Sequence, residues 1–124
     1  MPLPGPPLKS AVPPADVLHF GLQANPDEPA LVAADRIWTW RELDSTSSRL
    51  AANYLSLGLS PGDRVASLMP NRGELIIHYL ACLKAGLVST PLNYRYQAPE
   101  IDHALEVSGA AIILAHAERD NDLA

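Results

Sequence analysis

The sequence GDRVASLMPN at residues 62–71, together with LACLKAGLVSTPLNYR at residues 80–95, decides the fold of this chain. The apolar run at residues 64–69 predicts a buried strand, and the longer run at residues 72–85 predicts a helix that Gly86 ends. Residues 87–91 predict a second strand. Because strand, helix and strand follow one another in that order, we expect a right-handed parallel crossover.

A second crossover follows the first. Pro99 stands where the first turn of a helix accepts proline, and Gly109 marks the end of that helix. Residues 110–115 then predict a third strand. The resulting order is βαβαβ, and strands that are nearly continuously apolar are typical of a parallel sheet covered on both faces. The sequence therefore predicts an α/β fold built on a parallel-sheet unit.

The helix at residues 72–85 is apolar around most of its circumference, so we expect neighbours on several of its sides. Asn71 and Glu74 have the three-residue spacing of an N-terminal cap, which predicts that Asn71 caps this helix. Leu80 and Leu83 are predicted core residues.

Upstream of this unit the sequence predicts a short helix, a hairpin and a longer helix. The short helix spans residues 16–25, and strands at residues 30–33 and 36–39 form the hairpin around a turn at Ala34-Asp35. Thr39 and Glu42 have the spacing of a capping box, which predicts that the longer helix begins after Thr39. Trp38 and Leu43 occupy the positions of a hydrophobic staple, and Gly58 suits a left-handed helix end. The predicted apolar face of this helix consists of Leu43, Leu50, Tyr54 and Leu57.

Composition excludes several classes of protein. Six of the 12 prolines lie within the first fourteen residues, which predicts a flexible leader over residues 1–15.

With 9 basic and 14 acidic side chains and no basic run, nucleic-acid binding is not expected. The sequence predicts neither a transmembrane segment, since no apolar stretch is long enough, nor a secretory signal. The single cysteine excludes an intrachain disulfide framework, so we expect a cytoplasmic protein.

Local patterns for phosphate or metal binding are weak. The seven glycines are too far apart for a glycine-rich phosphate loop. The hydroxyl run at residues 45–48 resembles such a loop in composition, yet it lies in mid-helix and is interpreted as a solvated face. His78 and Cys82 stand four residues apart, and we interpret them as a helix-surface histidine beside a buried thiol, because no third ligand accompanies them.

Candidates for catalysis are defined by residue type alone. Possible nucleophiles are Ser67, Ser89, Thr90 and Cys82, and none lies in a Gly-x-Ser-x-Gly elbow. The acidic pairs Glu100 with Asp102 and Asp120 with Asp122 are interpreted as facing water. The segment at residues 69–71 (MPN) lies at the predicted carboxyl end of a parallel strand, where ligands of open α/β sheets gather. We assign no catalytic, cofactor-binding or metal-binding residue.

Four short motifs, in order along the chain, resemble the opening of the adenylate-forming acyl-activating enzymes. They are IWTWREL at residues 37–43, GDRV at residues 62–65, KAG at residues 84–86 and PLN at residues 91–93. The similarity runs from about Asp16 to Ala115. Asn93 favours the acyl-CoA synthetases over the peptide-synthetase adenylation domains, which tend to have aspartate there.

The resemblance implies a chain that forms part of an ATP-dependent acid–CoA ligase. Such enzymes join a carboxylate to AMP with release of pyrophosphate and then pass the acyl group to coenzyme A. ATP, Mg²⁺ and CoA are thus implied for the full-length enzyme, and none is expected to bind this piece alone. The family's phosphate loop, ribose-binding aspartate and catalytic lysine would all lie beyond Ala124.

Two hypotheses follow. In the first, residues 16–124 are a partial N-terminal domain, cut short at the C-terminal end, whose partner is the remainder of the adenylation domain; the isolated piece is then predicted to be inactive and prone to self-association. In the second, the chain is a short non-catalytic α/β module that binds a protein partner through an exposed sheet edge.

Overall fold

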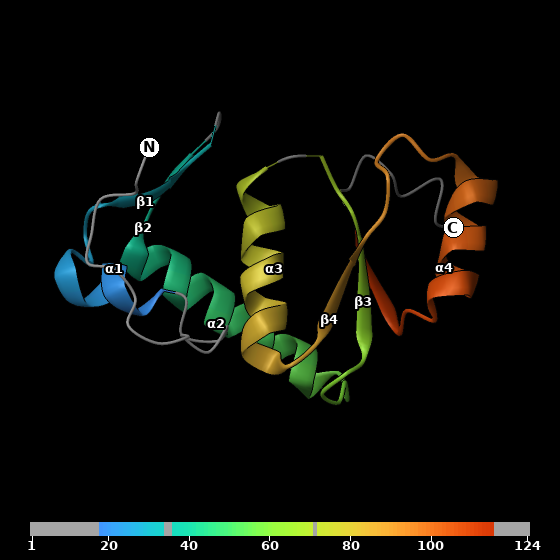
Figure 1. Ribbon diagram of the computed structural model, residues 1–124, viewed down its shortest axis with the longest axis horizontal. Helices are drawn as coiled ribbons and strands as arrows, with labels where there is room; N and C mark the ends of the chain where they lie inside the picture. Colours follow the sequence, from blue (N-terminus) through green and yellow to red (C-terminus); the bar gives the residue numbers. More distant parts are fainter. Residues whose placement is uncertain (1–17, 34–35, 71, 116–124) are drawn as a thin grey trace, which may run out of the picture.

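The computed structural model describes residues 18–33, 36–70 and 72–115. Its elements are α1 (His19–Ala24), β1 (Pro29–Val32), β2 (Ile37–Thr39), α2 (Trp40–Ser56), β3 (Arg64–Leu68), α3 (Gly73–Ala85), β4 (Val88–Pro91), α4 (Ala98–Ser108) and β5 (Ile112–Ala115). Figure 1 shows the hairpin with α1 at one end, the sheet with α4 at the other, and α3 between them. The predicted leader at residues 1–15 lies outside the described residues.

A three-stranded parallel sheet with the order β4-β3-β5 forms the larger half. In its register Ala66 of β3 lies between Thr90 of β4 and Ile113 of β5. The first crossover leaves β3 on one side and the second returns to its other side, so α3 and α4 lie on opposite faces of the sheet (Figure 1). The predicted βαβαβ unit is confirmed, and the central β3 is buried as a parallel strand requires.

The hairpin and the capping box are also confirmed. Strands β1 and β2 pair antiparallel, while the predicted turn at Ala34-Asp35 lies outside the described residues. At the start of α2 the backbone N–H of Glu42 donates to Thr39 Oγ1 at 3.1 Å, and Glu42 Oε1 accepts from the backbone N–H of Thr39 at 3.1 Å. Two of the backbone donors at this helix end are thereby satisfied, and the N–H groups of Trp40 and Arg41 donate to the carbonyls of Glu28 and Pro26.

Two apolar clusters make up much of the core among the described residues, and α3 contributes to both. The first joins α3 to the sheet and the second half of α2; it contains Ala51, Tyr54, Leu59, Val65, Ala81, Cys82, Ala85 and Leu87. The second joins α3 to the hairpin, α1 and the first half of α2; it contains Leu18, Trp38, Leu43, Ile77 and Leu80. The predicted staple residues thus lie in one cluster, and α3 links the two halves of the molecule.

Three details of the helices differ from the sequence prediction. Helix α3 begins at Gly73 with Arg72 as its N-cap and no side-chain capping bond, and the predicted cap Asn71 lies outside the described residues. Leu57 is 67% exposed because α2 ends at Ser56, one residue before it. Leu83 is 43% exposed, so its assignment to the core is wrong.

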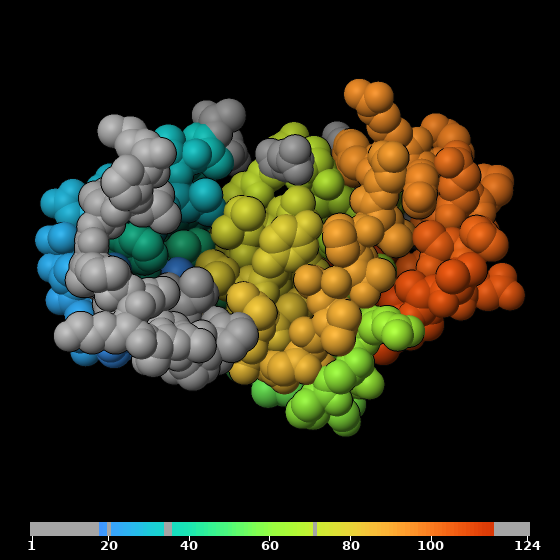
Figure 2. All heavy atoms as spheres, in the orientation of Figure 1, coloured from blue at the N-terminus to red at the C-terminus, as the bar shows by residue number. Residues whose placement is uncertain are grey.

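The exposure of Leu83 follows from its position on α3. Ile76 stands seven residues earlier, so the two side chains share one face of the helix, and Ile76 is also exposed. This face is turned away from both apolar clusters. Figure 2 shows α3 (yellow) at the centre of one surface of the molecule, between the hairpin half and the segment that follows β4. The prediction of neighbours on several sides holds for the rest of the helix.

Candidate functional site

A cavity of about 440 Å³ lies at the carboxyl ends of β3 and β4. Its walls come from the ends of these strands, from α3 and from the loop after β4: Ser67, Met69, Pro70, Leu75, Tyr79, Pro91, Leu92, Asn93, Tyr94 and Arg95. The carboxyl edge of a parallel sheet is where ligands of such folds bind. The topological switch point itself lies between β3 and β5, because the first crossover leads from β3 to β4 and the second leads from β4 to the other side of β3. Met69 and Pro70 lie here as the sequence predicts, and Asn71 lies outside the described residues.

Ser67 is the most deeply placed polar group of this cavity. Its side chain is 1% exposed, and its hydroxyl has no hydrogen-bond partner among the described residues. Its backbone carbonyl accepts a hydrogen bond from the N–H of Leu92 at 2.8 Å, which holds the loop after β4 against β3. Asn93 Oδ1 accepts from the N–H of Arg95 at 2.9 Å within that loop. No base contacts the Ser67 hydroxyl in the described part of the chain, so the cavity can hold a polar group but does not activate a nucleophile.

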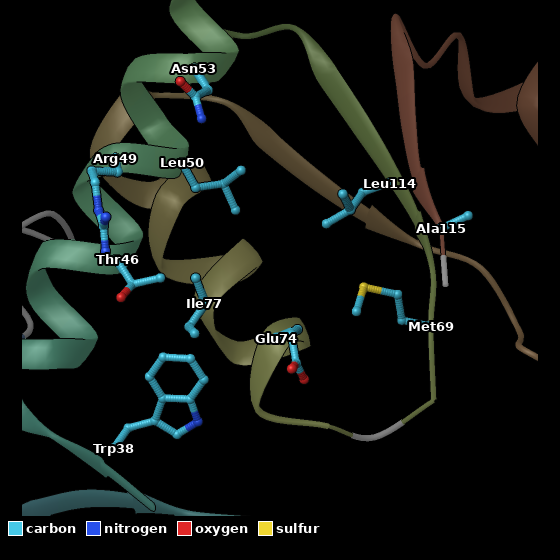
Figure 3. A pocket seen from close by; sticks show the side chains of 10 residues that line it. All are labelled: Trp38, Thr46, Arg49, Leu50, Asn53, Met69, Glu74, Ile77, Leu114 and Ala115. Atoms are coloured by element: carbon cyan, nitrogen blue, oxygen red, sulfur yellow. The ribbon is translucent and has the colours of Figure 1, made fainter. Parts of the chain in front are cut away.

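A second cavity of about 450 Å³, which we call the Trp38 groove, lies on the other side of the β3 end. It is lined by Trp38, Thr46, Arg49, Leu50, Asn53, Met69, Glu74, Ile77, Leu114 and Ala115. Figure 3 shows Leu50 and Ile77 facing Met69 and Leu114 across the open space, with the Trp38 ring at one end. The buried Trp38 Nε1 has no hydrogen-bond partner among the described residues.

The pair His78 and Cys82 belongs to a buried cluster with Tyr54. The Tyr54 hydroxyl lies 2.7 Å from His78 Nδ1, and Cys82 Sγ lies 3.8 Å from His78 Nε2. His78 is fully buried, so its interpretation as a helix-surface residue is wrong. Burial lowers the pKa of His78 to about 4 and raises the pKa of Cys82 to about 11. The imidazole and the thiol are therefore both neutral at pH 7, which suits a packing contact rather than a ligand set or a reactive thiol.

The other candidate residues named from the sequence do not lie together in the structure. In the hydroxyl run, Ser47 is fully buried and donates to the carbonyl of Asp44 at 3.1 Å, so the solvated-face interpretation fails for this residue, while Ser45 and Ser48 are exposed. Ser89 and Thr90 lie on β4, half-buried. Glu100 accepts from the backbone N–H of Gln97 at 3.2 Å at the start of α4, and Asp102 is exposed. Asp120 and Asp122 lie outside the described residues.

The described residues do not fit a triphosphate or a metal ion by themselves. No three His, Cys, Asp or Glu side chains converge on a possible metal position in this part of the chain. The glycines with positive φ lie singly in turns and at helix ends, at Gly58, Gly62, Gly86 and Gly109, so they build no phosphate loop within the described ranges. None of the helices described is long and apolar enough to cross a membrane.

Sequence reasoning located the strand edge but missed the groups that form its cavities. The sequence indicates Ser67 only as a possible nucleophile, by residue type, and gives no signal of a site role for Arg95 or Trp38. The one usable signal was topological, because residues that follow neighbouring parallel strands meet at one edge of the sheet. The Trp38 groove shares this signal in part, since Met69 follows β3 and Leu114 and Ala115 end the neighbouring β5, while the rest of its lining comes from β2, α2 and α3.

A family model described as AMP-binding enzyme matches residues 20–124. The chain belongs to the AMP-binding enzyme family. The resemblance inferred from the four motifs is thereby confirmed. Feruloyl-CoA synthase from Amycolatopsis sp is 45% identical over 83 residues, which cover 64% of this chain and 17% of the synthase. Phosphinothricin tripeptide synthetase PhsC from Streptomyces viridochromogenes is 39% identical over 98 residues, which cover 79% of this chain and 9% of that protein.

Solved structures of this family have the same fold. The N-terminal domain of FACL13 from Mycobacterium tuberculosis matches with a TM-score of 0.82 and 29% identity, over 89% of this chain and 28% of that one. This chain thus spans less than a third of this solved domain and less than a fifth of the two curated relatives above.

Proposed function

We propose that this chain is the N-terminal part of an ATP-dependent acyl-CoA ligase. The proposed reaction joins a carboxylate to AMP with loss of pyrophosphate, after which the acyl group passes to the thiol of coenzyme A. The observation that carries the proposal is the 45% identity to feruloyl-CoA synthase within a chain that the AMP-binding enzyme model matches. Asn93 lines the cavity at the carboxyl ends of β3 and β4. This asparagine favours the acyl-CoA branch of the family over the peptide synthetases.

In this proposal the chain supplies scaffold and part of a ligand-binding edge rather than reacting groups. ATP, Mg²⁺ and CoA would be held mainly by residues downstream of Ala124, because the described residues form neither a phosphate loop nor a metal cluster. The remainder of the adenylation domain is the proposed partner. The 124-residue chain alone is expected to be inactive and to self-associate, and the full protein is expected in the cytoplasm.

The first experiment is the intact mass of the native gene product, detected in its source cells with an antibody to residues 18–115. A product several times heavier than 13.3 kDa supports the proposal, since the relatives are several times longer than this chain. A product near 13.3 kDa overturns it.

Activity is tested on the same product by ATP–pyrophosphate exchange and by acyl-CoA formation with a panel of aromatic and aliphatic carboxylates. The proposal expects both activities from the longer product and neither from the 124-residue chain. Exchange without CoA acylation would place the protein among enzymes with another acyl acceptor and overturn the second step.

The alternative of a short binding module has one observation in its favour. Strands β4 and β5 each pair only with β3 among the described residues, so both edges of the sheet present unpaired backbone groups. A product near 13.3 kDa that captured an extended peptide along either edge would support this second function.

A further inference from the structure

We draw no further inference here: the strongest candidate, the exposed apolar face of α3 at Ile76 and Leu83, is an unpartnered surface patch, and nothing in the structure shows what covers it.

Discussion

The hydroxyl of Tyr54 lies 2.7 Å from Nδ1 of His78, and this buried contact joins α2 to α3. The two rings meet edge to face, with an interplanar angle of 87°. Both residues are at most 3% exposed, so each satisfies a polar atom that would otherwise be buried alone. The contact holds together the two helices that carry most of the core.

Acid is expected to weaken this helix pair. Burial lowers the pKa of His78 from 6.5 to about 4, so between these values the unfolded chain binds more protons than the folded one. Neutral His78 makes its full contribution to the free energy of unfolding above pH 6.5, and this contribution is lost as the pH falls toward 4. In that window the free energy of unfolding should fall by up to about 1.4 kcal/mol for each pH unit. Urea unfolding at pH 7, 6 and 5 measures this slope.

Two variants distinguish the effect of His78 on the pH dependence of stability from the effects of other titrating groups. His78→Gln has no group that titrates at this position, so the slope between pH 7 and 5 should become smaller. Tyr54→Phe removes the hydroxyl but keeps the buried imidazole, so this less stable variant should retain the slope. A slope unchanged by His78→Gln would contradict the assignment.

The two leucines at positions 80 and 83 of α3 should respond very differently to truncation. Leu80 is 9% exposed within the second core cluster, and Leu80→Ala is expected to cost about 2–5 kcal/mol of unfolding free energy. Leu83 is 43% exposed, and Leu83→Ala is expected to cost less than about 1 kcal/mol. Equilibrium denaturation of the 124-residue chain compares them, and equal losses would contradict the placement of α3.

This contrast shows what could be predicted from the sequence. The order and type of the elements were predictable because turns, caps and periodicity are local, as at the capping box of Thr39 and Glu42 and at the left-handed glycines. Which apolar residues of α3 are covered was not predictable, because apolar residues lie around most of that helix and periodicity then selects no single face.

The candidate sites were less predictable than the order of the elements, because they depend on contacts between segments far apart in the sequence. The edge of the sheet near Met69 followed from the strand order alone. The burial of Ser67 and His78 depends on contacts between segments far apart in the sequence, such as Tyr54 with His78. Four scattered histidines and one cysteine give no sequence signal for such a cluster.

Lys84 is expected to stabilise the packing of α3 against α2. Its Nζ lies 2.7 Å from Asp44 Oδ1, 2.9 Å from the Asp44 carbonyl oxygen and 2.9 Å from Ser48 Oγ. The Lys84 side chain is only 16% exposed, so Lys84→Met should cost about 1–2 kcal/mol through the lost charge-assisted bonds.

The matched control is the ion pair of Arg41 with Asp27, whose side chains are 64% and 78% exposed. Arg41→Gln should leave the denaturation midpoint nearly unchanged, because water screens this pair. The effect of Lys84→Met should also persist in high salt, where an exposed pair would be screened further. If the denaturation midpoint of Lys84→Met equals that of Arg41→Gln, Lys84 does not stabilise the contact between α3 and α2.

Thr39 should stabilise the start of α2 through its hydroxyl, which accepts the N–H of Glu42 at 3.1 Å. Thr39→Ala leaves this donor without its acceptor and is expected to cost about 1 kcal/mol. Thr39→Ser keeps the acceptor and should retain most of that stability, while Ser45→Ala, at an exposed position of the same helix, should be nearly neutral. Chemical denaturation of the three variants distinguishes a cap from general surface packing, since packing alone would make Thr39→Ser as costly as Thr39→Ala.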